Sequence, residues 1–375
     1  MLSSEAAESR SEALKVLHVA ETLPGGIATY LRDLLPLHIA DPAIGEIRVL
    51  APQDQLTHLK VLPADMLYGY ARSGRNVGSL WNLVVALRAQ AAEFRPQIIH
   101  LHSSFAGVIG RLLRPWLPKG VRIVYCPHGW AFSRDDSRIS RLAYIWAERC
   151  LASRANAWVA ISQHELDAAV AVGIRADHAH LINNGVRDSQ SVTVTAAPAF
   201  DSTYLNLLFV GRHDRQKGLD TLLSAMAQLL EKRVRLYIAG AGVVSRATKQ
   251  ENTDNIFWLG WLAEDELIAH YRACDAIVVP SRWEGFGLVA IEAMSASKAV
   301  IAARTGALSE IVDDGRTGRL VGAENSNELA QVLMETNREE LTRWGAAGRK
   351  KYTEKYDVVR VSHELSMLYQ DLLKA

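Results

Sequence analysis

Two glutamates eight residues apart stand out in the second half of the chain. The segment 280–293 reads PSRWEGFGLVAIEA, in which a short apolar run is followed by a turn with Gly285 and by a helix predicted from about Gly287. The two glycines leave the backbone N–H groups at the start of this helix open to a phosphate. Glu284 and Glu292 are carboxylates that can accept hydrogen bonds from vicinal hydroxyls. The segment therefore predicts a site for a ligand with both phosphate and sugar hydroxyls.

A loop with two basic residues follows another predicted strand. The segment 211–218 reads GRHDRQKG, in which Gly211 makes a turn and Arg212 and Lys217 are nearby cations. Placed against a diphosphate, two cations would neutralise the negative charge that develops on a departing phosphate. A solvated basic loop is the alternative interpretation. The segment favours a site for a leaving group.

Three segments of the first half place polar groups after predicted strands. Gly25 and Gly26 form a turn that opens a helix, where backbone N–H groups can reach a phosphate or an acceptor hydroxyl. His102 and Ser103 follow a second strand, and His128 follows a third. A single histidine or a Gly-Gly turn is more often structural than functional. These residues are candidates because ligands of parallel sheets bind at the carboxyl ends of the strands.

The order of these motifs resembles the retaining family-4 glycosyltransferases. The stretch P-S-x-x-E-G-F-G-L-x-x-x-E-A carries that family's E-x7-E signature, and G-R-x-x-x-x-K-G matches its basic loop. The resemblance runs from Lys15 to about Val321 and implies the GT-B fold, in which two Rossmann-like α/β domains with parallel sheets face a central cleft. It implies a nucleotide-sugar donor held by the second domain. The donor-binding residues that it implies are Gly211, Gly285, Phe286, Gly287, Leu288, Glu292 and Trp261.

The resemblance also implies a role for individual side chains. Glu284 would contact the donor sugar and Glu292 the ribose of the nucleotide, and the backbone at the start of the following helix would meet the diphosphate. The implied catalytic residues are His128, Glu284, Arg212 and Lys217. The implied acceptor or phosphate loops contain Gly25, Gly26, His102 and Ser103.

One position departs from the family pattern, and metal signatures are missing. The family has Asp after Asn-Gly-Val, where this chain has Arg187. No D-x-D, no H-E-x-x-H and no cluster of Cys and His occurs in the sequence. We therefore expect neither a metal nor another cofactor.

Alternating strands and helices predict two domains with parallel sheets. Helices are expected at Leu219–Leu230, Glu266–Ala273 and Tyr356–Ala375. The expected domains are 1–195 for the acceptor, 196–355 for the nucleotide sugar, and a C-terminal helix 356–375 that packs back toward the first domain. The expected strands are Lys15–Ala20, Ile47–Ala51, Ile98–Leu101, Val121–Cys126, Ala157–Ile161, Ala179–Ile182, Leu205–Val210, Arg235–Ala239, Asn255–Leu259, Ala276–Pro280 and Lys298–Ala303.

The composition excludes several other classes of protein. The 375 residues include 42 Lys and Arg against 41 Asp and Glu, so the net charge of +1 does not indicate a nucleic-acid partner. Three scattered cysteines form no disulfide framework, and no apolar run approaches the length of a membrane helix. The polar start of the chain does not resemble a signal peptide. We expect a cytoplasmic protein.

Charge is unevenly distributed along the chain. The stretch Phe105–Arg154 holds nine Arg and Lys against three Asp and Glu, and it contains Trp116, Trp130 and Trp146. Basic residues interleaved with aromatic ones can lie on an anionic membrane surface. A solvated face over a few core aromatics is an equally good interpretation. The membrane interpretation places the protein at the inner face of the cytoplasmic membrane.

The sequence predicts sugar transfer with retention of configuration. The donor would be a nucleoside-diphosphate sugar, with UDP favoured by the resemblance, and the acceptor a hydroxyl of a glycan or lipid-linked glycan in bacterial surface polysaccharide synthesis. Two alternatives stay open. One is a nucleotide-sugar epimerase of the same two-domain shape, and the other is a non-catalytic binding subunit.

Overall fold

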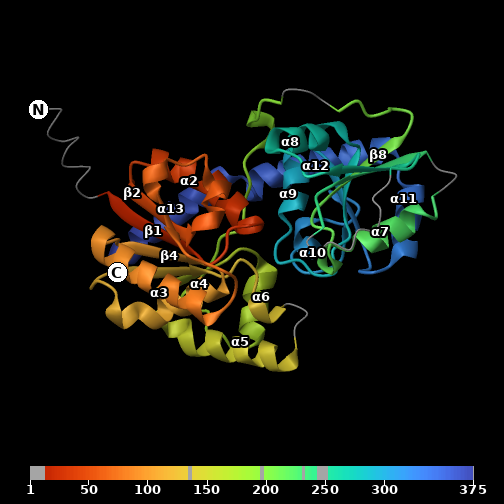
Figure 1. Cartoon of the computed structure of the whole chain (residues 1–375). Helices are drawn as coiled ribbons and strands as arrows, with labels where there is room; N and C mark the ends of the chain where they lie inside the picture. Colours follow the sequence, from red (N-terminus) through yellow and green to blue (C-terminus); the bar gives the residue numbers. More distant parts are fainter. Residues whose placement is uncertain (1–12, 134–136, 195–197, 230–232, 243–251, 375) are drawn as a thin grey trace, which may run out of the picture. The chain divides into compact units, whose positions relative to one another are not determined.

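The chain folds into two compact units (Figure 1). This computed structural model describes residues 13–133, 137–194, 198–229, 233–242 and 252–374. The first unit contains the chain up to Asn184 and again from Val358, and the second contains Gly185–Asp357. The chain thus leaves the first unit before residue 195, where the sequence placed the boundary, and its last helix belongs to that unit. Both units are α/β, as expected.

The first unit is built on a seven-stranded sheet with the order β3-β2-β1-β4-β5-β6-β7, and all of its paired strands are parallel. Its strands are short apolar runs because both faces of a parallel sheet are covered by helices. They are β1 Leu14–Ala20, β2 Ile44–Pro52, β3 Leu67–Tyr70, β4 Ile98–His102, β5 Arg122–Cys126, β6 Ala157–Ala160 and β7 Ala179–Leu181.

Helices cover both faces of this sheet. Leu17 and Val19 of β1 pack into a core with α3 and α4, whereas His18 between them faces α2 and α13, because side chains alternate along a strand. Helix α5 packs on α4, and α13 packs on α2. The helices are α2 Gly26–Ala40, α3 Val77–Phe94, α4 Ser104–Leu113, α5 Arg138–Leu151, α6 Gln163–Ala171 and α13 Val358–Lys374, with 3₁₀ turns at Gln53–Leu59, Ala64–Met66, Arg114–Trp116, Ala131–Ser133 and Ala152–Arg154.

The second unit is built on a six-stranded parallel sheet with the order β10-β9-β8-β11-β12-β13. Its strands are β8 Leu205–Val210, β9 Val234–Ala239, β10 Ile256–Gly260, β11 Ala276–Val279, β12 Ala299–Ala303 and β13 Gly318–Val321. Its helices are α7 Leu219–Met226, α8 Glu264–Ala273, α9 Leu288–Ser295, α10 Leu308–Ile311, α11 Ser326–Glu335 and α12 Arg338–Lys355, with 3₁₀ turns at Ser189–Ser191 and Arg215–Lys217. None of the described helices in either unit is long and apolar enough to span a bilayer.

The predicted strands are all present, with ends that differ by up to three residues, and two strands were not predicted. The two strands that the sequence did not predict are β3 and β13, which are four residues long and lie at an edge of their sheets. Helix α7 ends at Met226, so the predicted helix up to Leu230 is too long, and α8 begins two residues earlier than expected, at Glu264. The terminal helix begins at Val358 rather than Tyr356, and Ala375 lies outside the described residues.

A buried ion pair holds α4, α5 and β5 together. Arg111 donates to Glu148 with an Nη2–Oε2 distance of 2.7 Å, and the Tyr125 hydroxyl donates to the other carboxylate oxygen at 2.9 Å. Arg111 is only 2% exposed, and Trp130 is 3% exposed with its ring stacked on Phe132. Arg111 and Trp130 therefore belong to the core and not to the basic and aromatic surface that the sequence suggested.

Candidate functional site

Two loops at strand ends of the second unit lie against each other. One follows β8 and the other follows β11. Gly218 has a φ of 64°, and a Cβ there would lie 2.1 Å from the carbonyl oxygen of Pro280, so this contact requires glycine. The backbone N–H of Arg282 donates to the Gln216 carbonyl at 2.8 Å, and the Gln216 amide donates to the carbonyl of Trp283 at 3.2 Å. The contacts fix the basic loop beside the first glutamate of the E-x7-E motif.

An ion pair links the two loops. Lys217 Nζ lies 2.6 Å from Glu284 Oε2, and the Ser281 hydroxyl donates to the same oxygen at 3.2 Å. The side chains of Lys217 and Glu284 are 18% and 11% exposed, so both charges are largely withdrawn from water. An ammonium has three donors. This geometry positions Lys217 for a further anionic group without a rearrangement of its own loop.

Arg212 lies in the same loop but is more open to solvent. Its guanidinium is 3.1 Å from the carboxylate of Asp214 and donates to the Gln216 side chain at 2.9 Å. Its side chain is 53% exposed. Asp214 also accepts a hydrogen bond from the backbone N–H of Lys217 at 3.1 Å. Asp214 thus bonds to the guanidinium of Arg212 and to the backbone of Lys217, and both residues lie in this one small loop.

The second glutamate lies on the helix that follows. Helix α9 begins at Leu288 after Gly287, whose φ of 102° is one that L side chains rarely adopt. Glu292 is half-buried on this helix, and its Oε2 accepts a hydrogen bond from the Tyr271 hydroxyl at 2.8 Å. Burial, together with the negative charge of Glu292, holds the pKa of Tyr271 well above its usual value, so Tyr271 stays a donor. Tyr271 orients the carboxylate.

The remaining predicted donor residues differ in what they can offer. Phe286 is buried, and its ring packs edge-on against Tyr356, so its side chain belongs to the core. Only the Phe286 backbone could therefore contact a ligand. Trp261 follows β10 and is 78% exposed. Three further predicted residues are half-buried, so a ligand could reach their backbone or side chains: Gly211, Gly285 and Leu288.

In the first unit, the Gly-Gly turn and the serine loop each begin a helix. Gly25 has a φ of 95° and precedes α2, whose first residue is Gly26. Ser103 has a φ of 79° and precedes α4, and its hydroxyl is buried without a hydrogen-bond partner among the described residues. A non-glycine residue at such a φ is uncommon and concentrates at functional sites. Ser103 is therefore the more informative of these positions.

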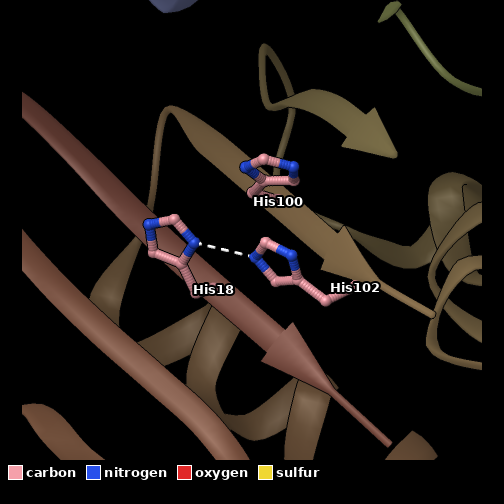
Figure 2. A group of neighbouring side chains, drawn as sticks. All are labelled: His18, His100 and His102. Atoms are coloured by element: carbon pink, nitrogen blue, oxygen red, sulfur yellow. Dashed lines mark hydrogen bonds between the residues drawn. The ribbon is translucent and has the colours of Figure 1, made fainter. Parts of the chain in front are cut away.

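His128 and His102 are joined in one chain of imidazoles. His128 follows β5 with a φ of 53°, and its Nε2 is 2.9 Å from His102 Nδ1. His102 Nε2 is in turn 3.0 Å from His18 Nδ1 (Figure 2). His18 and His102 are fully buried, whereas His128 is half-buried. The sequence suggested that His102 faces the acceptor. Its ring is fully buried, so it cannot contact an acceptor directly, and it reaches the site through its hydrogen bond to His128.

A further buried histidine lies beside this chain. Figure 2 shows His100 next to His18 and His102, and nitrogen atoms of the three rings lie within 4.8 Å of one another. His100 Nδ1 is 2.6 Å from the Tyr369 hydroxyl of α13. The hydrogen bond between His18 and His102 occupies one nitrogen of each of these rings, and the Nε2 atoms of His18 and His100 are buried without a partner among the described residues.

Burial keeps these imidazoles neutral. It lowers the pKa values of His18, His100 and His102 well below 6.5, and neighbouring histidines lower them further. The pKa of His128 falls to about 3 through burial, and that of His38 on α2 falls to about 4 for the same reason. At neutral pH each ring therefore carries one proton and can donate at one nitrogen only.

Several residues of the site were not found from the sequence. Ser281 and Tyr271 bind the two glutamates, and Gln216 links the two loops. Ser281 and Gln216 lie inside the two quoted motifs, whereas Tyr271 lies outside them. A signal for His18 and His100 did exist, because each is the one polar residue of an otherwise apolar run, Val16–Ala20 and Ile98–Leu101. Arg187, at the position that departs from the family pattern, forms an ion pair with Glu264 of α8.

Comparison with known proteins agrees with this arrangement. Residues 24–190 match the family model "Glycosyltransferase Family 4", and residues 194–351 match "Glycosyl transferases group 1". An uncharacterized 41.2 kDa protein in the cps region of Klebsiella pneumoniae is 32% identical over 328 residues, which cover 85% of this chain and 89% of the relative.

Two solved structures share the fold of the whole chain. Anabaena Alr3699/HepE in complex with UDP has a TM-score of 0.76 and 21% identity, and the match covers 96% of this chain and all of the other. Sucrose-phosphate synthase from Thermosynechococcus elongatus has a TM-score of 0.79 and 21% identity, covering 96% and 99%. The two parallel-sheet units are those of the GT-B fold, which confirms the fold class expected from the sequence.

The chain belongs to the family-4 type of glycosyltransferase, and its E-x7-E motif and basic loop meet in the second unit as described above.

The buried histidines predict that the stability of the first unit depends on pH. Below pH 6.5 the unfolded chain takes up protons that the folded unit excludes. The contribution of these histidines to the free energy of unfolding is therefore complete above pH 6.5 and decreases as the pH is lowered toward 4. Each such histidine contributes a slope of about 1.4 kcal/mol per pH unit in this range. Urea denaturation at pH 7.5, 6 and 5 measures the slope.

A matched pair of variants isolates one histidine. His38→Leu removes a buried imidazole, so its slope below pH 6 should be smaller by about 1.4 kcal/mol per pH unit. His58→Leu removes an exposed imidazole and should leave the slope unchanged. Equal slopes in His38→Leu and wild type would show that His38 is protonated in the folded unit.

Proposed function

We propose that this protein is a retaining glycosyltransferase that uses a nucleoside-diphosphate sugar, with UDP as the nucleotide. The acceptor is a hydroxyl of a glycan or lipid-linked glycan in the synthesis of a bacterial surface polysaccharide. The observation that carries the proposal is the ion pair between Lys217 and Glu284, which joins the basic loop to the E-x7-E motif. The UDP and UDP-glucose complexes of HepE and the cps-region relative support the donor and the pathway.

The nucleotide sugar is assigned to the loops of the second unit. The ribose hydroxyls donate to Glu292, which Tyr271 orients. The diphosphate meets the backbone N–H groups after Gly287, where the start of α9 favours negative charge. Glu284 contacts the sugar, and the same carboxylate holds Lys217 toward the phosphates. Each half of the motif then binds a different part of one ligand.

The transfer is a same-face substitution. The bond between the anomeric carbon and the diphosphate oxygen breaks, the acceptor oxygen bonds to that carbon, and the hydroxyl proton passes to the leaving phosphate. Lys217 and Arg212 stabilise the negative charge on that phosphate, so no metal is required. His128 orients the sugar, and the turn at Gly25 together with Ser103 holds the acceptor. Catalysis then consists of positioning and charge stabilisation.

The proposal predicts which nucleotide stabilises the protein and through which carboxylate. UDP in EDTA should raise the melting temperature of wild type more than GDP or ADP does, because a ligand of the folded state stabilises it by mass action. Glu292→Gln should lower the UDP affinity at least tenfold, since hydrogen bonds to a charged group contribute about 1.5–3 kcal/mol. The measurement is a thermal-shift titration.

The control for this titration is Glu339→Gln, which changes an exposed carboxylate on α12 and should bind UDP like wild type. The proposal would be contradicted if none of the three nucleotides raised the melting temperature of wild type, with or without Mg²⁺. Equal affinities of Glu292→Gln and wild type would remove the ribose role of Glu292. Conversion of the donor to an isomeric nucleotide sugar without an acceptor would favour an epimerase.

The charge role of Lys217 predicts a change in turnover. Lys217→Met should lower kcat by about 10²-fold or more, as expected for loss of a donor that stabilises transition-state charge. Lys350→Met changes an exposed lysine on α12 and serves as the control. Initial rates with UDP-sugars, and NMR of the product anomer, measure turnover and retention. An unchanged kcat in Lys217→Met, or an inverted product, would refute the mechanism.

A further inference from the structure

Helix α5 of the first unit carries an exposed apolar stripe. Ile139, Leu142 and Trp146 are 82%, 66% and 71% exposed. They are three and four residues apart, so they lie along one side of the helix. Large side chains scattered singly on a surface are ordinary, but three on one helical face form a patch that marks an interaction surface.

The exposed charged residues of α5 itself are all positive. Arg138, Arg141 and Arg149 are exposed on α5. The acidic side chain of α5, Glu148, is buried and bonded to Arg111 and Tyr125, so it does not offset them at the surface. An exposed helix face with large apolar residues between arginines is typical of a helix that lies in a membrane interface.

The stripe continues into an open surface formed by side chains of α5 alone. It consists of Leu142, Ile145, Trp146, Arg149 and Cys150. This surface is mainly apolar, with one guanidinium at its edge. This combination fits a phosphate headgroup at Arg149 and the start of an acyl chain against Trp146.

We propose that α5 is the surface by which the first unit docks on an anionic lipid bilayer. The proposal rests on the proposed function, because it places the enzyme where a lipid-linked acceptor is held. A second copy of the chain is a poorer occupant of this face. A two-fold contact through α5 would oppose the same arginines of both copies, and like charges across an interface are unfavourable.

Vesicle flotation tests the docking surface. Wild type should float with vesicles that contain phosphatidylglycerol and not with phosphatidylcholine alone. Leu142→Ser/Trp146→Ser should reduce binding at least tenfold, and Arg138→Gln should reduce it about fivefold, as expected for one basic residue near a charged membrane. The control is Ile39→Ser/Met367→Ser, which removes exposed apolar side chains from α2 and α13.

Three outcomes would overturn the proposal. They are equal binding to both kinds of vesicle, equal binding of the stripe variant and wild type, and a wild-type dimer that the stripe variant converts to monomer. The UDP thermal shift of each variant is measured in parallel. A variant that loses vesicle binding but keeps the UDP shift separates the docking surface from the nucleotide site of the second unit.

The histidine chain carries a second, independent inference about proton placement. Its two contacts, His18 Nδ1 to His102 Nε2 and His102 Nδ1 to His128 Nε2, each need one proton. Because each neutral imidazole carries a single proton, only two registers are possible. In one register His18 is protonated at Nε2, and in the other at Nδ1.

The surroundings of His18 distinguish the two registers. His18 Nε2 is buried without a hydrogen-bond partner among the described residues. A buried N–H without an acceptor is rarer than a buried acceptor without a donor. The proton therefore belongs on His18 Nδ1, which donates to His102. His102 then donates from Nδ1 to His128, and His128 carries its proton on Nδ1.

We infer that His18 and His102 are positioning residues that hold His128 as the Nδ1–H tautomer. This gives His128 a fixed donor for a substrate oxygen, and it rests on the role proposed for His128. The half-buried position of His128 makes it the member of the chain nearest to solvent. The two buried histidines thus affect the sugar only indirectly, because their hydrogen bonds keep the proton of His128 on Nδ1.

Long-range ¹H–¹⁵N NMR of histidine-labelled wild type reads the tautomers without any activity. The expected result is Nδ1–H at His18, His102 and His128, and Nε2–H at any of them would overturn the inference. His18→Leu should lower kcat/KM up to about tenfold, the worth of one hydrogen bond. His18→Asn, whose amide can replace the donor, should restore it. Equal rates in both variants would also overturn it, whereas loss of UDP binding would instead question the proposed function.

Discussion

The ion pair between Lys217 and Glu284 is the interaction on which the second unit's site depends. It joins two loops that are separated by more than sixty residues in sequence and that end neighbouring strands, β8 and β11. The pair is possible only because Gly218 lets the backbone of one loop approach Pro280 of the other. A carboxylate and an ammonium that are both largely buried stabilise each other and also stay in place for a ligand. The two side chains that join the loops are therefore the ones to which the proposed function assigns donor binding.

The first unit organises its polar groups in a different way. Its imidazoles are kept neutral by burial and are connected by hydrogen bonds rather than by opposite charges. A neutral network has little electrostatic attraction to lose, but each member must be satisfied by its neighbour. The arrangement of His128 is thereby determined by residues one and two strands away in the sheet, His102 and His18. Ser103, next to His102, adds a strained backbone to the same strand end.

The sequence was sufficient where local patterns and chemistry coincide. Short apolar runs between helical segments identified most strands, and the glycine-flanked glutamates identified the loops of the second unit. The edge strands β3 and β13 were not predicted because their sequences, LYGY and GRLV, each contain a glycine and form no continuous apolar run. The contacts of Tyr271 with Glu292 and of Gln216 with Trp283 could not be found, since a hydrogen bond across distant segments leaves no local pattern. The burial of individual side chains could also not be predicted from the sequence. Arg111 and Trp130 belong to a basic and aromatic stretch of the sequence, yet they lie in the core.

The last helix has a consequence for the synthesis of the chain. Tyr369 of α13 bonds to His100 of β4 across 269 residues, and α13 packs on α2. During translation all seven strands of the first sheet emerge long before α13 does, whereas the second unit is continuous and is completed first. The part of the histidine face and of α2 that α13 covers therefore stays exposed until α13 has been made, and such exposed apolar surface invites aggregation or chaperone binding. A premature stop near the C-terminus would thus damage the unit that contains the N-terminus.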